Sequence, residues 1–178
     1  MAENISTLTH RPGYQTGGFV LFAASGIILL ALAFEYFGGY APCPLCLLQR
    51  YAYYAAIPLT FLALMAIGAE NRTLAGILFL LVGLGFLANA VLGGYHAGVE
   101  WGWWPGPDTC AQAAGQLGGG SGGLLQALEN HSVVSCADAA WRFLGLSFAG
   151  WNVVVSAVLG VCGLMAANQN LDQPPEIH

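Results

Sequence analysis

Five cysteines carry the most reactive side chains of this chain. Cys43 and Cys46 form a Cys-Pro-Leu-Cys motif, Cys110 and Cys136 lie far apart, and Cys162 stands alone. Paired cysteines can form a structural disulfide, supply half of a tetrahedral zinc site, or exchange disulfides with another protein. The spacing of the cysteines leaves all three chemistries open.

The surroundings of Cys46 favour disulfide exchange. A helix N-terminus lowers the pKa of a nearby thiol, and we expect Cys46 in the first turn of a helix. Arg50 follows four residues later on the same helical face, where a guanidinium would stabilise a thiolate. A charge so close to hydrocarbon indicates function, although Arg50 could instead extend to the membrane surface. Cys162 lies in an apolar run and is expected to be structural.

The composition is that of a membrane protein. Of 178 residues, 57% are hydrophobic and 7% are charged, whereas a soluble domain carries about 25% charged residues. This composition excludes an ordinary soluble enzyme and a disordered tail. A net charge of -5, with only four Lys and Arg residues, also excludes a nucleic-acid-binding protein.

Four stretches have the length and hydropathy of transmembrane helices, which need about 20 apolar residues. The expected spans are residues 17–37, 45–68, 73–95 and 144–167. The sequence therefore predicts an all-α membrane protein, in which residues 1–178 form a single domain built as a four-transmembrane-helix bundle. The first stretch also fits a cleaved signal peptide with a site at Ala31-Leu32-Ala33, but its apolar run is longer than such a segment needs.

A long loop at residues 96–143 connects the third and fourth spans. Four spans place both termini on one side of the membrane and the first four cysteines on the other. The four arginines divide equally between the sides, so the positive-inside rule decides nothing. A glycine run at residues 118–123 predicts a flexible hinge. Residues 124–133 fit either a short helix on the membrane surface or a plain loop. An aromatic belt at the membrane surface is expected from Trp101, Trp103, Trp104 and Trp141.

The chain resembles the disulfide bond formation protein B (DsbB) family, membrane oxidoreductases of the bacterial inner membrane. The four-span layout matches this family over nearly the whole chain. One departure is the glycine run, which replaces part of a bulkier amphipathic segment. The matching residues are Cys43-Pro44-Leu45-Cys46 with Arg50, Gly94–Trp101, Trp104–Cys110, Ser135–Asp138 and Trp141–Ser147.

The resemblance implies a thiol oxidase that sustains disulfide bond formation. It would reoxidise a periplasmic DsbA-like dithiol protein of thioredoxin fold and pass the electrons to membrane quinone, either ubiquinone or menaquinone. The implied location is the inner membrane, with both termini cytoplasmic, both cysteine pairs in a periplasmic position and the protein monomeric. The sequence has no glycine fingerprint for flavin or nicotinamide, and we expect no metal.

The resemblance also implies a role for each cysteine of the two pairs. Cys110 would form the mixed disulfide with the partner, Cys136 would relay electrons to Cys43, and Cys46 would lie beside the quinone ring. Two further residues are implied near the quinone, namely Arg50 and His96.

Three alternatives remain open from the residues. A non-catalytic membrane protein with two structural disulfides would keep them oxidised when a reduced partner is added. A zinc-binding membrane protein would contain stoichiometric zinc. A vitamin K epoxide reductase-like enzyme is the nearest rival in chemistry, but that family usually places its Cys-x-x-Cys late in the chain.

Overall fold

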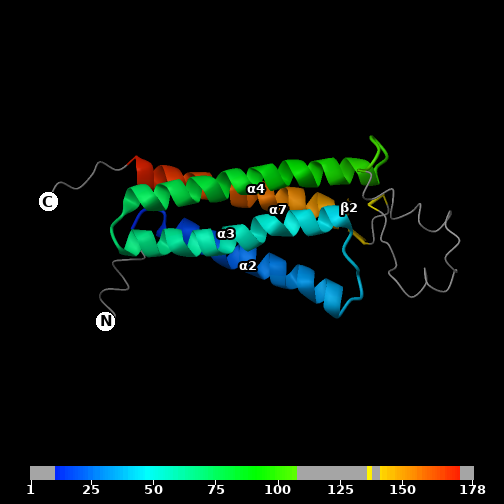
Figure 1. Cartoon of the computed structure of the whole chain (residues 1–178), viewed down its shortest axis with the longest axis horizontal. Coiled ribbons are helices and arrows are strands. Elements are labelled where there is room, and N and C mark those ends of the chain that lie inside the picture. The colour runs from blue at the N-terminus through cyan, green and yellow to red at the C-terminus, as the bar shows by residue number, and fades with distance from the viewer. Residues whose placement is uncertain (1–10, 108–135, 138–140, 173–178) are drawn as a thin grey trace, which may run out of the picture.

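The structure is a computed structural model that describes residues 11–107, 136–137 and 141–172. Four long helices and one small hairpin make up the regular elements of these residues (Figure 1). They are α2 (Tyr14–Tyr36), α3 (Pro44–Gly68), α4 (Arg72–Glu100), β1 (Arg142–Phe143), β2 (Leu146–Ser147) and α7 (Phe148–Leu171).

All four helices are long and apolar enough to cross a membrane. The predicted all-α four-helix bundle is therefore confirmed. Large apolar side chains such as Phe22 and Val91 remain 79% and 75% exposed on the outside of the bundle. Apolar residues on this face suit contact with lipid, because helices that are apolar on all sides are typical of membrane spans.

Two boundaries differ from the expected spans in ways that affect the site. Helix α4 continues to Glu100, so His96 lies inside a helix and not at the start of the loop. Helix α7 begins at Phe148, because the preceding residues form an antiparallel hairpin. The hairpin turns at Leu144 and Gly145, whose φ values are 51° and 83°. Positive φ values suit the tight turns of two-residue hairpins. Hydropathy alone detects neither feature.

Side chains cap three of the helix starts. Cys43 caps α3, with its sulfur accepting from the backbone N–H of Cys46 and with Pro44 in the first turn. Asn71 accepts from the N–H of Leu74 at the start of α4. Ser147 accepts from the N–H of Gly150 at the start of α7. Such caps satisfy N–H groups that a helix leaves unpaired.

Helices α4 and α7 pack closely through glycine. A Cβ atom added to Gly163 would lie 2.9 Å from the backbone Cα and N atoms of Gly83. Small residues at such positions let two membrane helices approach until their backbones touch. Helix α2 behaves differently, since it diverges from the rest of the bundle toward its C-terminal end (Figure 1).

The bundle has two distinct ends. The turn between α3 and α4 lies at the same end as the start of α2 and the end of α7 (Figure 1). The link from α2 to α3, the end of α4 and the hairpin lie at the opposite end. Cys43, Cys46 and Cys136 belong to this second end, because they share one buried cluster.

The contact between α4 and α7 provides a test of the packing. Gly163→Ala should destabilise the bundle by about 1–3 kcal/mol, because the new methyl group meets backbone that cannot move aside. The matched control is Gly85→Ala, since a Cβ there meets nothing within 4 Å. Thermal unfolding in detergent would compare the two variants. Equal melting temperatures would contradict the close approach.

Candidate redox site

The Cys-Pro-Leu-Cys motif forms the first turn of α3. The Cys43 and Cys46 sulfur atoms are 2.8 Å apart, and both are free thiols. The backbone N–H of Cys46 lies 3.2 Å from Cys43 Sγ. The side-chain hydrogen bond with Cys46, supported by His96 and by this N–H, lowers the pKa of the Cys43 thiol, although burial opposes it. The contacts of Cys43 with Cys46 and His96 therefore favour a thiolate at Cys43, whereas the sequence led us to expect one at Cys46.

His96 connects this pair to the last turns of α4. Its Nε2 atom lies 3.6 Å from Cys43 Sγ, and the residue is 2% exposed. Glu100 lies one turn further on, with Oε1 at 3.8 Å from the same Nε2 atom. The second oxygen of Glu100 is buried without a hydrogen-bond partner. The extension of α4 thus brings an imidazole and a carboxyl group to the cysteine pair.

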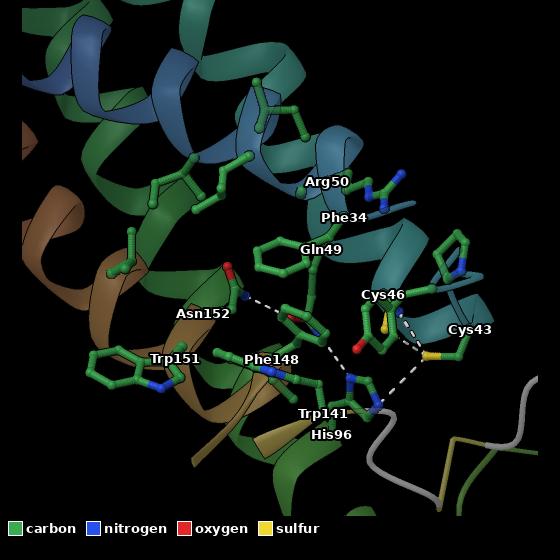
Figure 2. Close-up of a pocket in the computed structure, with 18 of the residues that line it drawn as sticks. Phe34, Cys43, Cys46, Gln49, Arg50, His96, Trp141, Phe148, Trp151 and Asn152 are labelled. Carbon is green, nitrogen blue, oxygen red and sulfur yellow. Dashed lines mark hydrogen bonds between the residues drawn. The ribbon is translucent and has the colours of Figure 1, made fainter. Parts of the chain in front are cut away.

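Gln49 contacts the other nitrogen of the His96 imidazole ring. Its Nε2 atom lies 2.9 Å from His96 Nδ1, and its Oε1 atom accepts from Asn152 Nδ2 at 2.6 Å. Figure 2 shows Asn152, Gln49, His96 and Cys43 connected in one row by dashed hydrogen bonds. Gln49 was not predicted as a site residue, and its position directly before Arg50 is the only signal for it in the sequence.

Arg50 has a partner that the sequence analysis did not foresee. Its Nη1 atom donates to Glu35 Oε2 at 2.5 Å, which joins α3 to α2. The two side chains are 13% and 23% exposed. Charged groups near hydrocarbon need such pairing. Arg50 also lines the same cavity as Cys46.

A cavity of about 420 Å³ opens between α2, α3 and α7, where α2 diverges. Most of its lining is apolar, and a few polar groups converge on it. An apolar cavity with a small number of polar groups is typical of sites for small organic molecules. The polar or ionisable lining residues include Cys43, Cys46, Gln49, Arg50, His96, Glu100 and Asn152.

Aromatic rings form one wall of this cavity. The ring of Phe34 lies 5.8 Å from that of Trp141 and 5.3 Å from that of Phe148. Trp141 and Phe148 stack with an interplanar angle of 23°. The sequence analysis assigned Trp141 to an aromatic belt, whereas the structure places it in the cavity lining.

The second cysteine pair is only partly described. Cys136 is 1% exposed, is disulfide-bonded, and belongs to the buried cluster of Cys43, Leu45 and Val99. Cys110, the glycine run and the expected surface helix lie outside the described residues. Cys162 is a free thiol packed against the main core cluster, in agreement with its structural assignment.

The donor atoms of Cys43, Cys46 and His96 all lie within 4.8 Å of one another. Distance alone would let these groups hold a metal ion. A histidine ligand needs a bare nitrogen, however, and Gln49 already donates to Nδ1. Coordination through Nε2 would therefore require this hydrogen bond to rearrange.

Comparison with known proteins identifies the family. The family described as "Disulfide bond formation protein DsbB" matches residues 15–166. The chain belongs to the DsbB family. A "Disulfide bond formation protein B" from Marinobacter nauticus is 30% identical over 157 residues, covering 83% of this chain and 87% of the relative. A protein of the same name from Hahella chejuensis is 31% identical over 156 residues, with coverages of 83% and 87%. No solved structure matches the chain.

The family and the four helices together establish two points. The chain is a multi-pass membrane protein, and its family acts in disulfide bond formation. The Cys43–Cys46 pair, the buried Cys136 and the cavity are the features of the structure through which a DsbB protein could act.

The lowered pKa of Cys43 gives a direct prediction. In the reduced protein, Cys43 should react with iodoacetamide at a lower pH than a free cysteine, because the thiolate is the nucleophile. Cys46→Ala removes the largest cause of the lowered Cys43 pKa. This variant should move the midpoint of the pH profile of the alkylation rate to higher pH. Mass spectrometry of alkylated peptides would follow Cys43. The control Cys162→Ala should leave the profile unchanged, and an unchanged profile in Cys46→Ala would contradict the assignment.

Proposed function

We propose that the protein is a protein-dithiol:quinone oxidoreductase that generates disulfides. It reoxidises a DsbA-like periplasmic dithiol protein and delivers the two electrons to membrane quinone. The observation that carries the proposal is the position of the Cys43–Cys46 pair. The pair borders an apolar cavity on one side and packs with the disulfide-bonded Cys136 on the other.

The first part of the reaction is an exchange between disulfides. Thiolates attack disulfides through mixed intermediates, so neighbouring pairs can pass electrons along. A partner dithiol reduces the Cys110–Cys136 disulfide and leaves as a disulfide. Cys136 then exchanges with the Cys43–Cys46 disulfide. The burial of Cys136 beside Cys43 supports this step, and the three other cysteines are free thiols, which supports Cys110 as the partner of Cys136.

The second part moves the electrons into the cavity. A thiolate at Cys43, with its sulfur 2.8 Å from Cys46 Sγ, is placed to close the Cys43–Cys46 disulfide as two electrons leave. Quinone supplies the acceptor for two electrons and two protons, and the products are one quinol and one partner disulfide. At the rim of the quinone ring, Arg50 would provide positive charge and His96 would provide an N–H group.

The residues of the cavity fit a quinone. Its volume accommodates a substituted ring, and the Phe34, Trp141 and Phe148 rings offer flat surfaces for stacking. A second apolar groove between α2 and α7 shares Ile27, Leu30 and Val155 with the cavity. This groove would accommodate an isoprenoid tail and lead to lipid. The proposed orientation has both termini in the cytoplasm and the cysteines at the periplasmic face of the inner membrane, in a monomer.

The proposal is tested by coupled turnover. Purified protein, a reduced thioredoxin-fold dithiol protein and a ubiquinone analogue should yield quinol and partner disulfide in equal amounts. Cys46→Ala should abolish turnover, whereas Cys162→Ala should retain it. Replacing the ubiquinone analogue with a menaquinone analogue would show which quinone is preferred. Turnover that persists in Cys46→Ala would overturn the assignment of this cysteine.

A matched pair of substitutions on α2 tests the location of the quinone. Ala31 lines the cavity, whereas Ala33 on the same helix does not. Ala31→Phe should raise the KM for quinone by about tenfold or more, since overpacking costs about 1–3 kcal/mol. Ala33→Phe should leave this KM near the wild-type value. Disulfide exchange with the partner, measured by thiol trapping without quinone, should be unchanged in both variants. Equal KM values would place the quinone elsewhere.

A further inference from the structure

A row of polar side chains crosses the bundle and ends at the cysteine pair. Its far end is formed by Tyr53 and Asn89, which lie on α3 and α4. The Tyr53 hydroxyl donates to Asn152 Oδ1 at 2.8 Å, and Asn89 Nδ2 lies 3.4 Å from the same oxygen. The Ser156 hydroxyl is a third donor, at 3.2 Å from this oxygen. With three donors facing Oδ1, the amide nitrogen of Asn152 points the other way, toward Gln49.

The orientation of Asn152 determines that of Gln49. Asn152 Nδ2 donates to Gln49 Oε1 at 2.6 Å, which turns the amide nitrogen of Gln49 toward His96. That nitrogen lies 2.9 Å from His96 Nδ1. A carboxamide nitrogen only donates, so Nδ1 has to accept. A neutral imidazole has one donor and one acceptor nitrogen, and its proton is therefore on Nε2.

The protonated Nε2 atom faces the redox pair. It lies 3.6 Å from Cys43 Sγ and 3.8 Å from Glu100 Oε1. Other titratable or charged groups that line the same cavity are the Cys46 thiol, the Arg50 guanidinium and the hydroxyl groups of Tyr40 and Tyr53. Figure 2 shows the ring of His96 between Gln49 and Cys43, with one nitrogen directed at each.

We propose that Asn152 and Gln49 are positioning residues that hold His96 in the Nε2–H tautomer. His96 then donates a hydrogen bond to the Cys43 thiolate and does not act as the base that removes the thiol proton. The use of this thiolate in electron transfer rests on the proposed function, but the tautomer itself is a property of the protein without quinone.

Reversing the tautomer would require several groups to turn together. A proton on Nδ1 would face the NH₂ group of Gln49. Turning Gln49 would bring its NH₂ group against that of Asn152, and turning Asn152 as well would direct its NH₂ group at Asn89. An unsatisfied buried donor is costly in surroundings of low dielectric constant. The buried row therefore specifies one arrangement of protons at His96.

The tautomer is measured directly by nitrogen NMR of isotope-labelled histidine in the reduced full-length protein. The chain has four histidines, and His96→Gln identifies the signals of His96. The expected spectrum has a protonated Nε2 and a bare Nδ1. A protonated Nδ1, in a neutral ring or in an imidazolium, would overturn the proposal whether or not the protein reduces quinone.

Variants of the row test the positioning role. Gln49→Met keeps the side-chain length but removes the donor to Nδ1, so His96 should show both tautomers. Cys43 alkylation at mildly acid pH should then slow by roughly tenfold, which corresponds to a thiol pKa higher by about one unit. Asn152→Leu keeps the amide of Gln49 but leaves it free to turn. Both measurements should therefore shift in the same direction as in Gln49→Met, but by less.

The matched control is Thr60→Val on the same helix. Thr60 is fully buried and its hydroxyl has no hydrogen-bond partner, so this variant changes a buried polar group outside the row. It should leave both the His96 spectrum and the alkylation rate of Cys43 unchanged. A spectrum with Nε2–H alone in Gln49→Met, or equal slowing in Thr60→Val, would overturn the role of the row.

Discussion

Hydrocarbon offers no hydrogen-bond partners, so polar side chains within the spans have to satisfy one another. This constraint explains much of the arrangement around the cavity. The row from Tyr53 through Asn152 and Gln49 to His96 joins α3, α4 and α7. The ion pair between Arg50 and Glu35 joins α2 to α3 at the same end of the bundle. Each of these polar contacts therefore joins two helices.

The same contacts bring together the two environments that the proposed reaction needs. Cys43 caps α3 and packs with Cys136, a residue of the segment between α4 and α7. Cys46 lies in the first turn of the helix and borders an apolar cavity. In the proposed reaction, disulfide exchange occurs on one side of the motif and electron transfer to an apolar acceptor on the other. Helices α4 and α7 pack closely against each other, whereas the divergence of α2 leaves space for the cavity (Figure 1).

Local patterns in the sequence predicted the four helices and the redox motif, because both are encoded over short stretches. The fold class is confirmed. Cys46 and Arg50 line the same cavity, and their role in one redox site stays a prediction. The partners of polar residues could not be predicted, since Asn152 bonds to a residue 103 positions away and His96 to one 47 positions away. Hydropathy places Glu35 near the end of a span, yet it says nothing about the pairing of Glu35 with Arg50. The continuation of α4 to Glu100 was missed for a similar reason, because polar residues there resemble the start of a loop.

The central claim is that electrons pass from the Cys43–Cys46 dithiol to quinone in the cavity. The most direct measurement adds a ubiquinone analogue anaerobically to the fully reduced protein in lipid nanodiscs, without any partner, in a Cys110→Ser, Cys136→Ser variant. Mass spectrometry after thiol trapping then reports the state of each remaining cysteine. The account predicts a Cys43–Cys46 disulfide, free Cys162 and one quinol formed for each disulfide. Thiols that remain reduced in the presence of quinone would contradict it.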